Sequence, residues 1–159
     1  MGAKSEALAK QFEAKAQEAV AVLEKLSDTD WKKVTAAEKW TVGATTHHLA
    51  GAFEAVAGIV TAIVSGQAPR SFTTAMLEEM NAKHSREHAN CSRAETIALL
   101  KNSAPAAAAV VRGLSDDQLA KSGTVFADAP PMTAEQLIAR GLINHVDEHV
   151  ASIRKTVGH

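Results

Sequence analysis

The sequence lacks the chemical groups on which several classes of protein depend. Its single cysteine, Cys91, can form neither an internal disulfide nor a cysteine-based zinc module. Its 17 basic and 18 acidic side chains nearly cancel, and no run of Lys and Arg breaks that balance. Because the basic surface of a nucleic-acid-binding protein is missing, we expect no nucleic-acid partner.

Long hydrophobic runs are also scarce. The most apolar stretch, residues 49–64, contains Glu54 and is shorter than the roughly 20 residues of a membrane span, so we expect a buried helix and no membrane partner. The first residues are charged where a secretory signal would be apolar, and with the lone cysteine this favours a cytoplasmic location. A chain of 159 residues suits one domain, and we expect a single domain over residues 1–159.

The residues that are abundant favour helix. The chain is rich in Ala, Glu, Lys and Leu, only 4% aromatic, and has no alternating β-branched runs, so we expect an all-α fold. Helices are expected at about residues 3–26, 41–65, 73–89, 92–113 and 133–156. Thr41, Ser92 and Thr133 are the expected N-caps of the second, fourth and fifth helices. Pro105 should kink the fourth helix.

Two histidines near the end of the sequence have metal-chelating spacing. His145 and His149 lie four residues apart in a helical pattern, so both imidazoles leave the same side of one helix. At 100° per residue they fall within about 80° of Ile138, Leu142 and Ile153, which places them on the stripe that should face the core. The pair is therefore not expected on the solvated face.

His48 is the candidate for a third ligand. It lies early in the second helix, whereas His145 and His149 lie late in the last, so antiparallel packing would bring all three to one end of the bundle. Its neighbour His47 points about 100° away. Three nitrogens with open coordination positions are typical of a reactive rather than a structural metal site. Hydrogen-bonded core histidines without metal remain the alternative.

Other metal-bundle and nucleotide sites find no support. Ferritin-like di-iron proteins require Glu-x-x-His, but the residues three before the candidate ligands are Thr45, Leu142 and Val146. The sequence also has no Gly-rich phosphate loop and no nucleophile elbow.

A second pair, His84 and His88, forms one stripe of the third helix with Leu77 and Asn81. Polar residues at helical spacing usually face water, so we expect a solvated or pocket-rim face. In the functional version of this interpretation, the stripe borders a ligand that enters over the metal.

Several segments together resemble one family. They are Trp40-Thr-Val-Gly43 followed by His48-Leu-Ala50, then Asn81, then Gly113-Leu-Ser-Asp-Asp-Gln-Leu119, and finally His145-x-x-x-His149. In order and spacing the chain resembles the DinB/YfiT-like superfamily of metalloenzymes over nearly its whole length. Characterised members include thiol S-transferases that use bacillithiol and the mycothiol-dependent maleylpyruvate isomerase.

The resemblance implies a four-helix bundle of unusual connectivity, with an extra short helix. It also implies a divalent metal (Zn, Ni or Fe) on His48, His145 and His149, and an Asn81 that hydrogen-bonds a substrate or cofactor. Relatives often carry an acid directly after the first histidine of the pair, whereas here Val146 holds that place and Asp147 follows. The resemblance therefore does not carry over a role for that acid behind the metal ligands.

These observations favour a metal-dependent enzyme, a thiol S-transferase or a hydrolase. The metal would activate a low-molecular-weight thiol or a water for attack on a small-molecule electrophile. A metal-binding bundle without turnover, with a stress-response or interaction role, is the alternative. We also expect a homodimer, because the second helix carries a further apolar side that needs a cover, formed by Phe53, Val56, Val60 and Val64.

Overall fold

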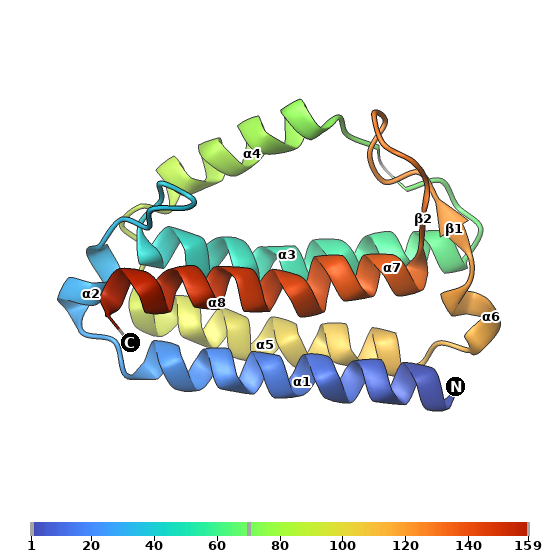
Figure 1. The fold of residues 1–159 in the computed structure, drawn as a ribbon, viewed down its shortest axis with the longest axis horizontal. Coiled ribbons are helices and arrows are strands. Elements are labelled where there is room, and N and C mark those ends of the chain that lie inside the picture. Colours follow the sequence, from blue (N-terminus) through green and yellow to red (C-terminus); the bar gives the residue numbers. More distant parts are fainter. Residues whose placement is uncertain (1, 70, 159) are drawn as a thin grey trace.

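The computed structural model describes residues 2–69 and 71–158, and most of them are helical. Four long helical segments lie side by side (Figure 1): α1 (Ala3–Glu24), α3 (Val42–Val64), α5 (Arg93–Arg112), and the continuous run of α7 (Ala134–Ile138), η1 (Ala139–Ile143) and α8 (Asn144–Val157). The shorter elements are α2 (Asp28–Lys32), α4 (Thr74–Glu87), α6 (Asp116–Leu119) and the paired strands β1 (Ser122–Gly123) and β2 (Met132–Thr133). The all-α four-helix bundle with an extra helix, α4, is therefore confirmed.

The order in which the chain passes through the bundle is unusual. In Figure 1, α1 and the α7–α8 run point one way, whereas α3 and α5 both point the other way. Two successive bundle helices, α3 and α5, are thus parallel neighbours, because α4 carries the chain back along the bundle between them. The α7–α8 run packs against both α1 and α3 and is antiparallel to α3.

The helices begin where side-chain caps were expected. The side-chain oxygens of Thr41, Ser92 and Thr133 each accept a hydrogen bond from a backbone N–H in the first turn of α3, α5 and α7. Such caps satisfy N–H groups that have no partner within the helix. The helix α5 continues through Pro105 without interruption.

The core lies between the four long segments and uses the residues that were expected to bind a second subunit. Phe53 is fully buried and meets Phe12 of α1 edge to face, with ring centroids 4.9 Å apart. Val60 is also fully buried, Val64 is 9% exposed, and Val56 faces Gly141 of η1. The argument for a homodimer from this apolar side is therefore wrong, because other helices of the same chain cover it. The homodimer itself stays a prediction.

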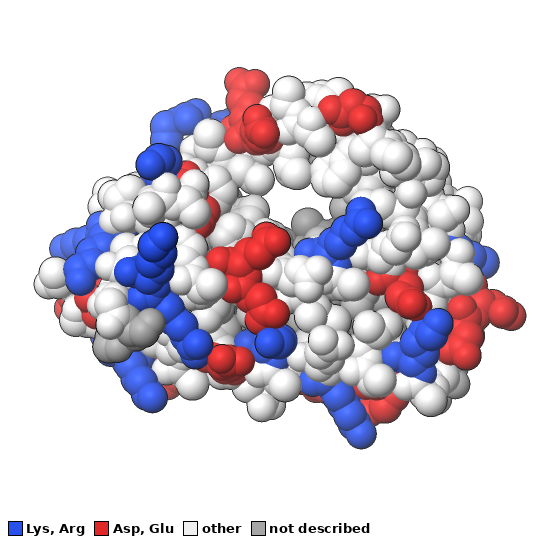
Figure 2. Space-filling model, in the orientation of Figure 1, with Lys and Arg blue, Asp and Glu red and all other residues white. Residues whose placement is uncertain are grey.

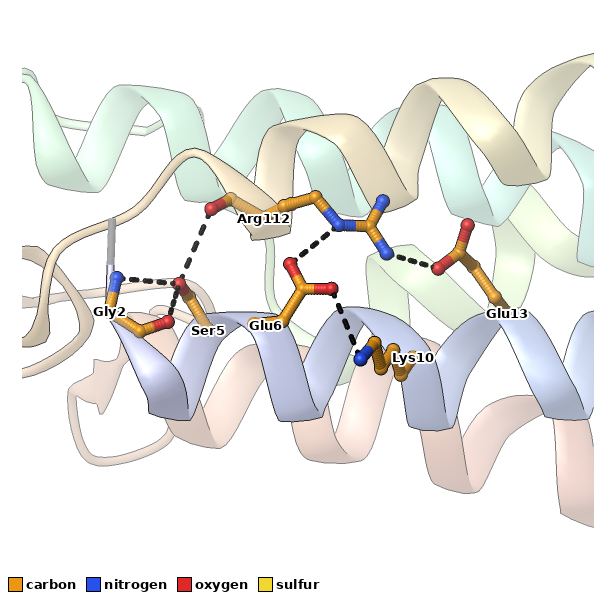
Figure 3. A network of polar contacts seen from close by, with 6 residues as sticks. All are labelled: Gly2, Ser5, Glu6, Lys10, Glu13 and Arg112. Carbon is orange, nitrogen blue, oxygen red and sulfur yellow. Dashed lines mark hydrogen bonds and ion pairs between the residues drawn. The ribbon is translucent and has the colours of Figure 1, made fainter.

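Charged groups fasten α1 to α5 at the end of the bundle where α1 begins (Figure 3). Arg112, at the end of α5, donates to Glu6 at 2.8 Å and also pairs with Glu13. Ser5 donates to the Gly2 carbonyl and contacts the Arg112 carbonyl. These pairs are partly exposed, so they add little stability, but they align the two helices at the end remote from the candidate histidines.

Helix α3 is long and apolar enough, by length and composition, to cross a membrane. In the structure it is a core helix, since it packs against α5, α7, η1 and α8 and buries eleven of its 23 residues. Long core helices commonly pass such a test, so it gives little support for a membrane segment.

Candidate metal centre

The structure brings the three predicted ligands together. His48 lies in the second turn of α3, and His145 and His149 lie in α8, which runs antiparallel to α3. One nitrogen from each ring lies within 4.8 Å of the others, and the Nε2 atoms of His48 and His145 are 3.2 Å apart. The ring centroids are separated by 5.1, 5.1 and 4.5 Å.

The spacing of these rings fits a metal ion. Two imidazole nitrogens bound about 2.1 Å from a tetrahedral ion lie about 3.4 Å apart, and their ring centroids lie about 5 Å apart. The observed separations are close to both values. Among the described residues, the cluster consists of these three side chains alone, which leaves coordination positions for a small molecule.

Burial keeps the three imidazoles in the form that binds metal. Burial, followed by the neighbouring rings of His145 and His149, lowers the pKa of His48 to about 3. Burial, followed by His145, lowers the pKa of His149 to about 4. The pKa of His145 is also lowered by burial, which the nearby Gly141 carbonyl partly offsets. Neutral imidazole is the ligand form, so at neutral pH no proton has to leave before a metal binds.

A wide turn of helix sets the direction of the histidine pair. The segment η1, residues Ala139–Ile143, is a π-helix, which holds more residues per turn than an α-helix. The buried stripe of α8 consequently consists of Val146, Val150 and Ile153. His145 and His149 each lie one position before a stripe residue, so they border the core instead of lying in its central stripe. The expectation that the pair lies off the solvated face is confirmed, whereas the shared stripe with Ile138 and Leu142 does not hold, because it assumed 100° per residue through the π-helical turn.

The loop before α3 supplies two further groups: Trp40, known from the sequence only as part of the family motif, and Glu38, which sequence reasoning missed. Trp40 lies against His48 and His149, with ring centroids at 5.2 and 6.5 Å. A carboxylate oxygen of Glu38 is 3.7 Å from Nδ1 of His149, and both side chains are nearly buried, at 10% and 13% exposure. No periodic pattern marks Glu38, because an irregular turn places it.

That turn has a well-defined backbone. Lys39 has a φ of 67°, in the left-handed region that side chains other than glycine rarely adopt. The Thr35 N–H donates to the Trp40 carbonyl at 2.8 Å, and the Val42 N–H donates to the Lys33 carbonyl at 2.8 Å. These bonds hold the loop across its base and present Glu38 and Trp40 to the histidines. A carboxylate that accepts from the second nitrogen of a metal-binding histidine fixes its ring and makes it a better ligand.

The acid on α8 itself does not take that role. Asp147 pairs with Lys15 of α1 at 3.0 Å, on the outer side of the helix. Val146 is buried in the core at 1% exposure. Glu38 thus supplies the carboxylate at this site from a different part of the chain.

The second histidine pair lies beside the first cluster, not on a solvated face. His84 and His88 are half-buried and meet His47 of α3, with 2.9 Å between His47 Nδ1 and His84 Nε2. We expected a solvated or a pocket-rim face, and the structure excludes the fully solvated alternative, because α4 turns this stripe toward α3. Asn81, one turn earlier on the same stripe, is also half-buried. Its predicted contact with a cofactor stays a prediction.

Helix α4 spans an opening above α3. Its start is held by Asp128, which accepts from the backbone and the hydroxyl of Thr74 at 3.0 and 2.6 Å. Only Ser85 of its 14 residues is buried, and Figure 2 shows an opening beneath the arch that it forms. Gly51 and Gly58 of α3, on the side between His47 and His48, are exposed and have nothing within 4 Å of where a Cβ would lie. Two histidine clusters lie at the end of this arch where the last turn of α4 meets the start of α3. The first consists of His48, His145 and His149, and the second of His47, His84 and His88.

A groove between α1 and α8, with a volume of about 490 Å³, contains none of the six described histidines. Four of its charged side chains pair with one another, as Lys15–Asp147 and Arg154–Glu18.

Comparison with known proteins shows the family of the chain. A family model described as the mycothiol maleylpyruvate isomerase N-terminal domain matches residues 12–149. The chain belongs to this family. It is therefore a member of the DinB/YfiT-like superfamily, as its motifs predicted. No curated protein sequence matches the chain.

Solved structures share the fold of this family member. An uncharacterised protein from Clostridium difficile 630 has a TM-score of 0.77 at 15% identity, over 98% of this chain and 96% of that one. YfiT from Bacillus subtilis, described as a probable metal-dependent hydrolase with an unusual four-helix bundle topology, has a TM-score of 0.70 at 20% identity, over 98% and 86%.

The mycothiol-dependent maleylpyruvate isomerase itself has a TM-score of 0.74 at 14% identity, over 94% of this chain and 60% of that one. The chain thus spans 60% of the isomerase's length. At these identities the likeness extends to the fold, and the chemistry of this chain has to be argued from its own residues.

Proposed function

We propose that this protein is a metal-dependent enzyme in which His48, His145 and His149 hold a divalent ion, Zn²⁺, Ni²⁺ or Fe²⁺. The observation that carries the proposal is the convergence of three neutral imidazoles beside the arch formed by α4. Nitrogen ligands of this kind suit first-row transition ions better than Mg²⁺ or Ca²⁺. The described relatives, a mycothiol-dependent isomerase and a probable metal-dependent hydrolase, support the same class of activity.

The residues of the chain have distinct roles in this proposal. A divalent ion at the site lowers the pKa of a thiol or water that binds it, which provides a nucleophile at neutral pH. The Glu38 carboxylate faces Nδ1 of His149 at 3.7 Å, where a small movement would let it accept a hydrogen bond and fix that ring. Trp40 covers His48 and His149 and keeps water from that side of the site. Asn81, on the arch, hydrogen-bonds the thiol cofactor or the substrate.

The substrate is a small electrophilic molecule, and the nucleophile is either a low-molecular-weight thiol, as in S-transferases, or water, as in hydrolases. The opening beneath α4 supports access by a small molecule. We keep the homodimer and the cytoplasmic location as parts of the proposal. A metal-binding bundle without turnover is the second candidate, since the geometry of the ligands alone does not require a reaction.

The test uses tag-free protein loaded with one equivalent of Zn²⁺ or Ni²⁺. Turnover of a chromogenic electrophile is measured with mycothiol, bacillithiol, glutathione or no added thiol. The proposal predicts turnover that His48→Ala abolishes and that the matched control Asn144→Ala, an exposed neighbour of His145, retains. Metal binding without turnover under any of these conditions would favour the non-catalytic candidate.

A further inference from the structure

Histidine is concentrated in one place in this protein. Six of the seven histidines in the sequence lie in two clusters of three, and the seventh, His159, is outside the described residues. The second cluster is formed by His47 of α3 with His84 and His88 of α4. It adjoins the first, since the rings of His48 and His84 meet edge to face at 6.2 Å. The function proposed above makes no use of this second cluster.

Its nitrogens lie close enough together to bind one ion after a movement of the rings. One nitrogen from each of the three rings lies within 4.8 Å of the others. Nδ1 of His88 donates to the His84 carbonyl at 2.9 Å, which leaves the Nε2 lone pair of His88 free to bind. Nδ1 of His84 is buried without a hydrogen-bond partner among the described residues. A buried polar nitrogen without a partner is unfavourable unless a ligand satisfies it.

The second cluster is more compressed than the first. The centroid of His88 lies 3.8 Å from that of His47 and 4.1 Å from that of His84, with the rings stacked. Rings bound to one tetrahedral ion have centroids about 5 Å apart, so the His88 ring has to swing outward for an ion to enter. His88 is the C-cap residue of α4 and only half-buried, so it has room for this movement.

We propose that His47, His84 and His88 form a second divalent-metal site, which binds Zn²⁺ or a similar first-row transition ion more weakly than the first. Three imidazoles, two of them four residues apart on one helix, are a sufficient ligand set for such an ion and leave a position for water. The lower affinity follows from the ring movement that binding requires.

Metal at this site would fasten α4 to α3. The start of α4 is tied to Asp128, and beyond its end Ala89 accepts from the Thr41 hydroxyl at 3.3 Å, whereas the helix between them is largely exposed. An ion shared by His47 and the His84–His88 pair would join the last turn of α4 directly to α3. The second site therefore sets how firmly the arch is closed beside the first site.

The test is a titration of metal-free, tag-free protein with Co²⁺, followed by its visible absorption and by equilibrium dialysis. We expect the wild type to bind two equivalents, the second more weakly. His88→Ala and His84→Gln should each lose the weaker equivalent and keep the tighter one. His48→Ala should keep the weaker and lose the tighter. Lys83→Ala, an exposed neighbour of His84, should bind two.

Hydrogen exchange gives a second readout, independent of activity. The second equivalent should slow exchange of amides near residues 84–88 in the wild type and in Lys83→Ala, but not in His88→Ala. One equivalent in the wild type, or two in both His84→Gln and His88→Ala, would overturn the proposal. Failure here would leave the first site intact, because that site is read separately in His48→Ala.

Discussion

The position of Glu38 beside a predicted metal ligand depends on the fold and not on the local sequence. Glu38 lies in a loop, and only the fold brings its carboxylate within 3.7 Å of His149 Nδ1. We predict that Glu38→Gln weakens metal binding at the first site by about 10- to 100-fold, the usual effect of removing such a partner. Competition with a chromogenic chelator measures the affinity. Glu54→Gln, an exposed change on α3, is the control, and equal affinities in the two variants would exclude this role.

The depressed pKa values of the histidines determine how metal-free protein responds to acid. Free histidine titrates near pH 6.5, whereas the pKa is about 3 for His48 and about 4 for His149. Between those values and 6.5 the unfolded chain binds more protons than the folded one. The free energy of unfolding is therefore constant with respect to these groups above about pH 6.5 and falls below it, by about 1.4 kcal/mol per pH unit for each histidine.

Urea titrations of metal-free protein between pH 7 and pH 5 test this expectation. His48→Ala should show a shallower decline than the wild type, because one depressed group has been removed. Equal slopes in the two proteins would mean that His48 is accessible to protons in the folded state.

At the scale of elements, the first turn of α3 is fixed by a close contact with α2. A Cβ on Gly43 would lie 2.6 Å from Nε1 of Trp31 and 2.8 Å from its Cε2. The Trp31 indole cannot move away easily, because its N–H donates to the Cys91 carbonyl at 2.9 Å. We predict that Gly43→Ala lowers the free energy of unfolding by about 1–3 kcal/mol.

Another glycine of the same helix supplies the control for that prediction. Gly51 has nothing within 4 Å of a Cβ position, so Gly51→Ala should stabilise α3 by about 0.5–1 kcal/mol. Urea denaturation of both variants measures the two changes, and a loss of stability in both would argue against contact with Trp31 as the cause.

The elements also show how much of the fold and of the candidate site could be predicted from the sequence. Helix positions and N-caps followed from periodicity and from Thr41, Ser92 and Thr133, because these signals are local. The convergence of His48 with His145 and His149 was also predictable, since it needs only antiparallel packing of two helices. The π-helical turn at Ala139–Ile143 was not predictable from periodicity, and Gly141 within it lies so close to α3 that a Cβ there would be 3.0 Å from the Val56 side chain.

The positions of α4 and of the loop before α3 could not be predicted from the sequence, for a similar reason. The stripe of His84 and His88 reads as solvated on an isolated helix, and it meets His47 only because the chain crosses over α3. Glu38 has no neighbours in sequence that share its role. Sequence periodicity predicts which residues share a face of one helix. The contacts of His84, His88 and Glu38 depend on how the chain runs between helices, which periodicity does not predict.

For the whole molecule, the bundle is held by a core that spans opposite helices. Phe53 of α3 and Phe12 of α1 meet at its centre, both fully buried. We predict that Phe53→Glu prevents cooperative folding, because it places an unpaired charge in this contact. Circular dichroism should show lost helix, whereas Val34→Glu, at a side chain 60% exposed, should leave the fold unchanged. A folded Phe53→Glu monomer from a dimeric wild type would instead place Phe53 at a subunit interface.

The central claim is that α3 and α8 together hold a divalent metal. The most direct measurement is a crystal structure of tag-free protein loaded with one equivalent of Zn²⁺, with anomalous diffraction at the zinc edge. We predict one strong peak about 2.1 Å from a nitrogen of each of His48, His145 and His149, with at least one ligand that is not protein. A peak bound elsewhere, no peak, or a fourth protein ligand that closes the coordination sphere would contradict the account.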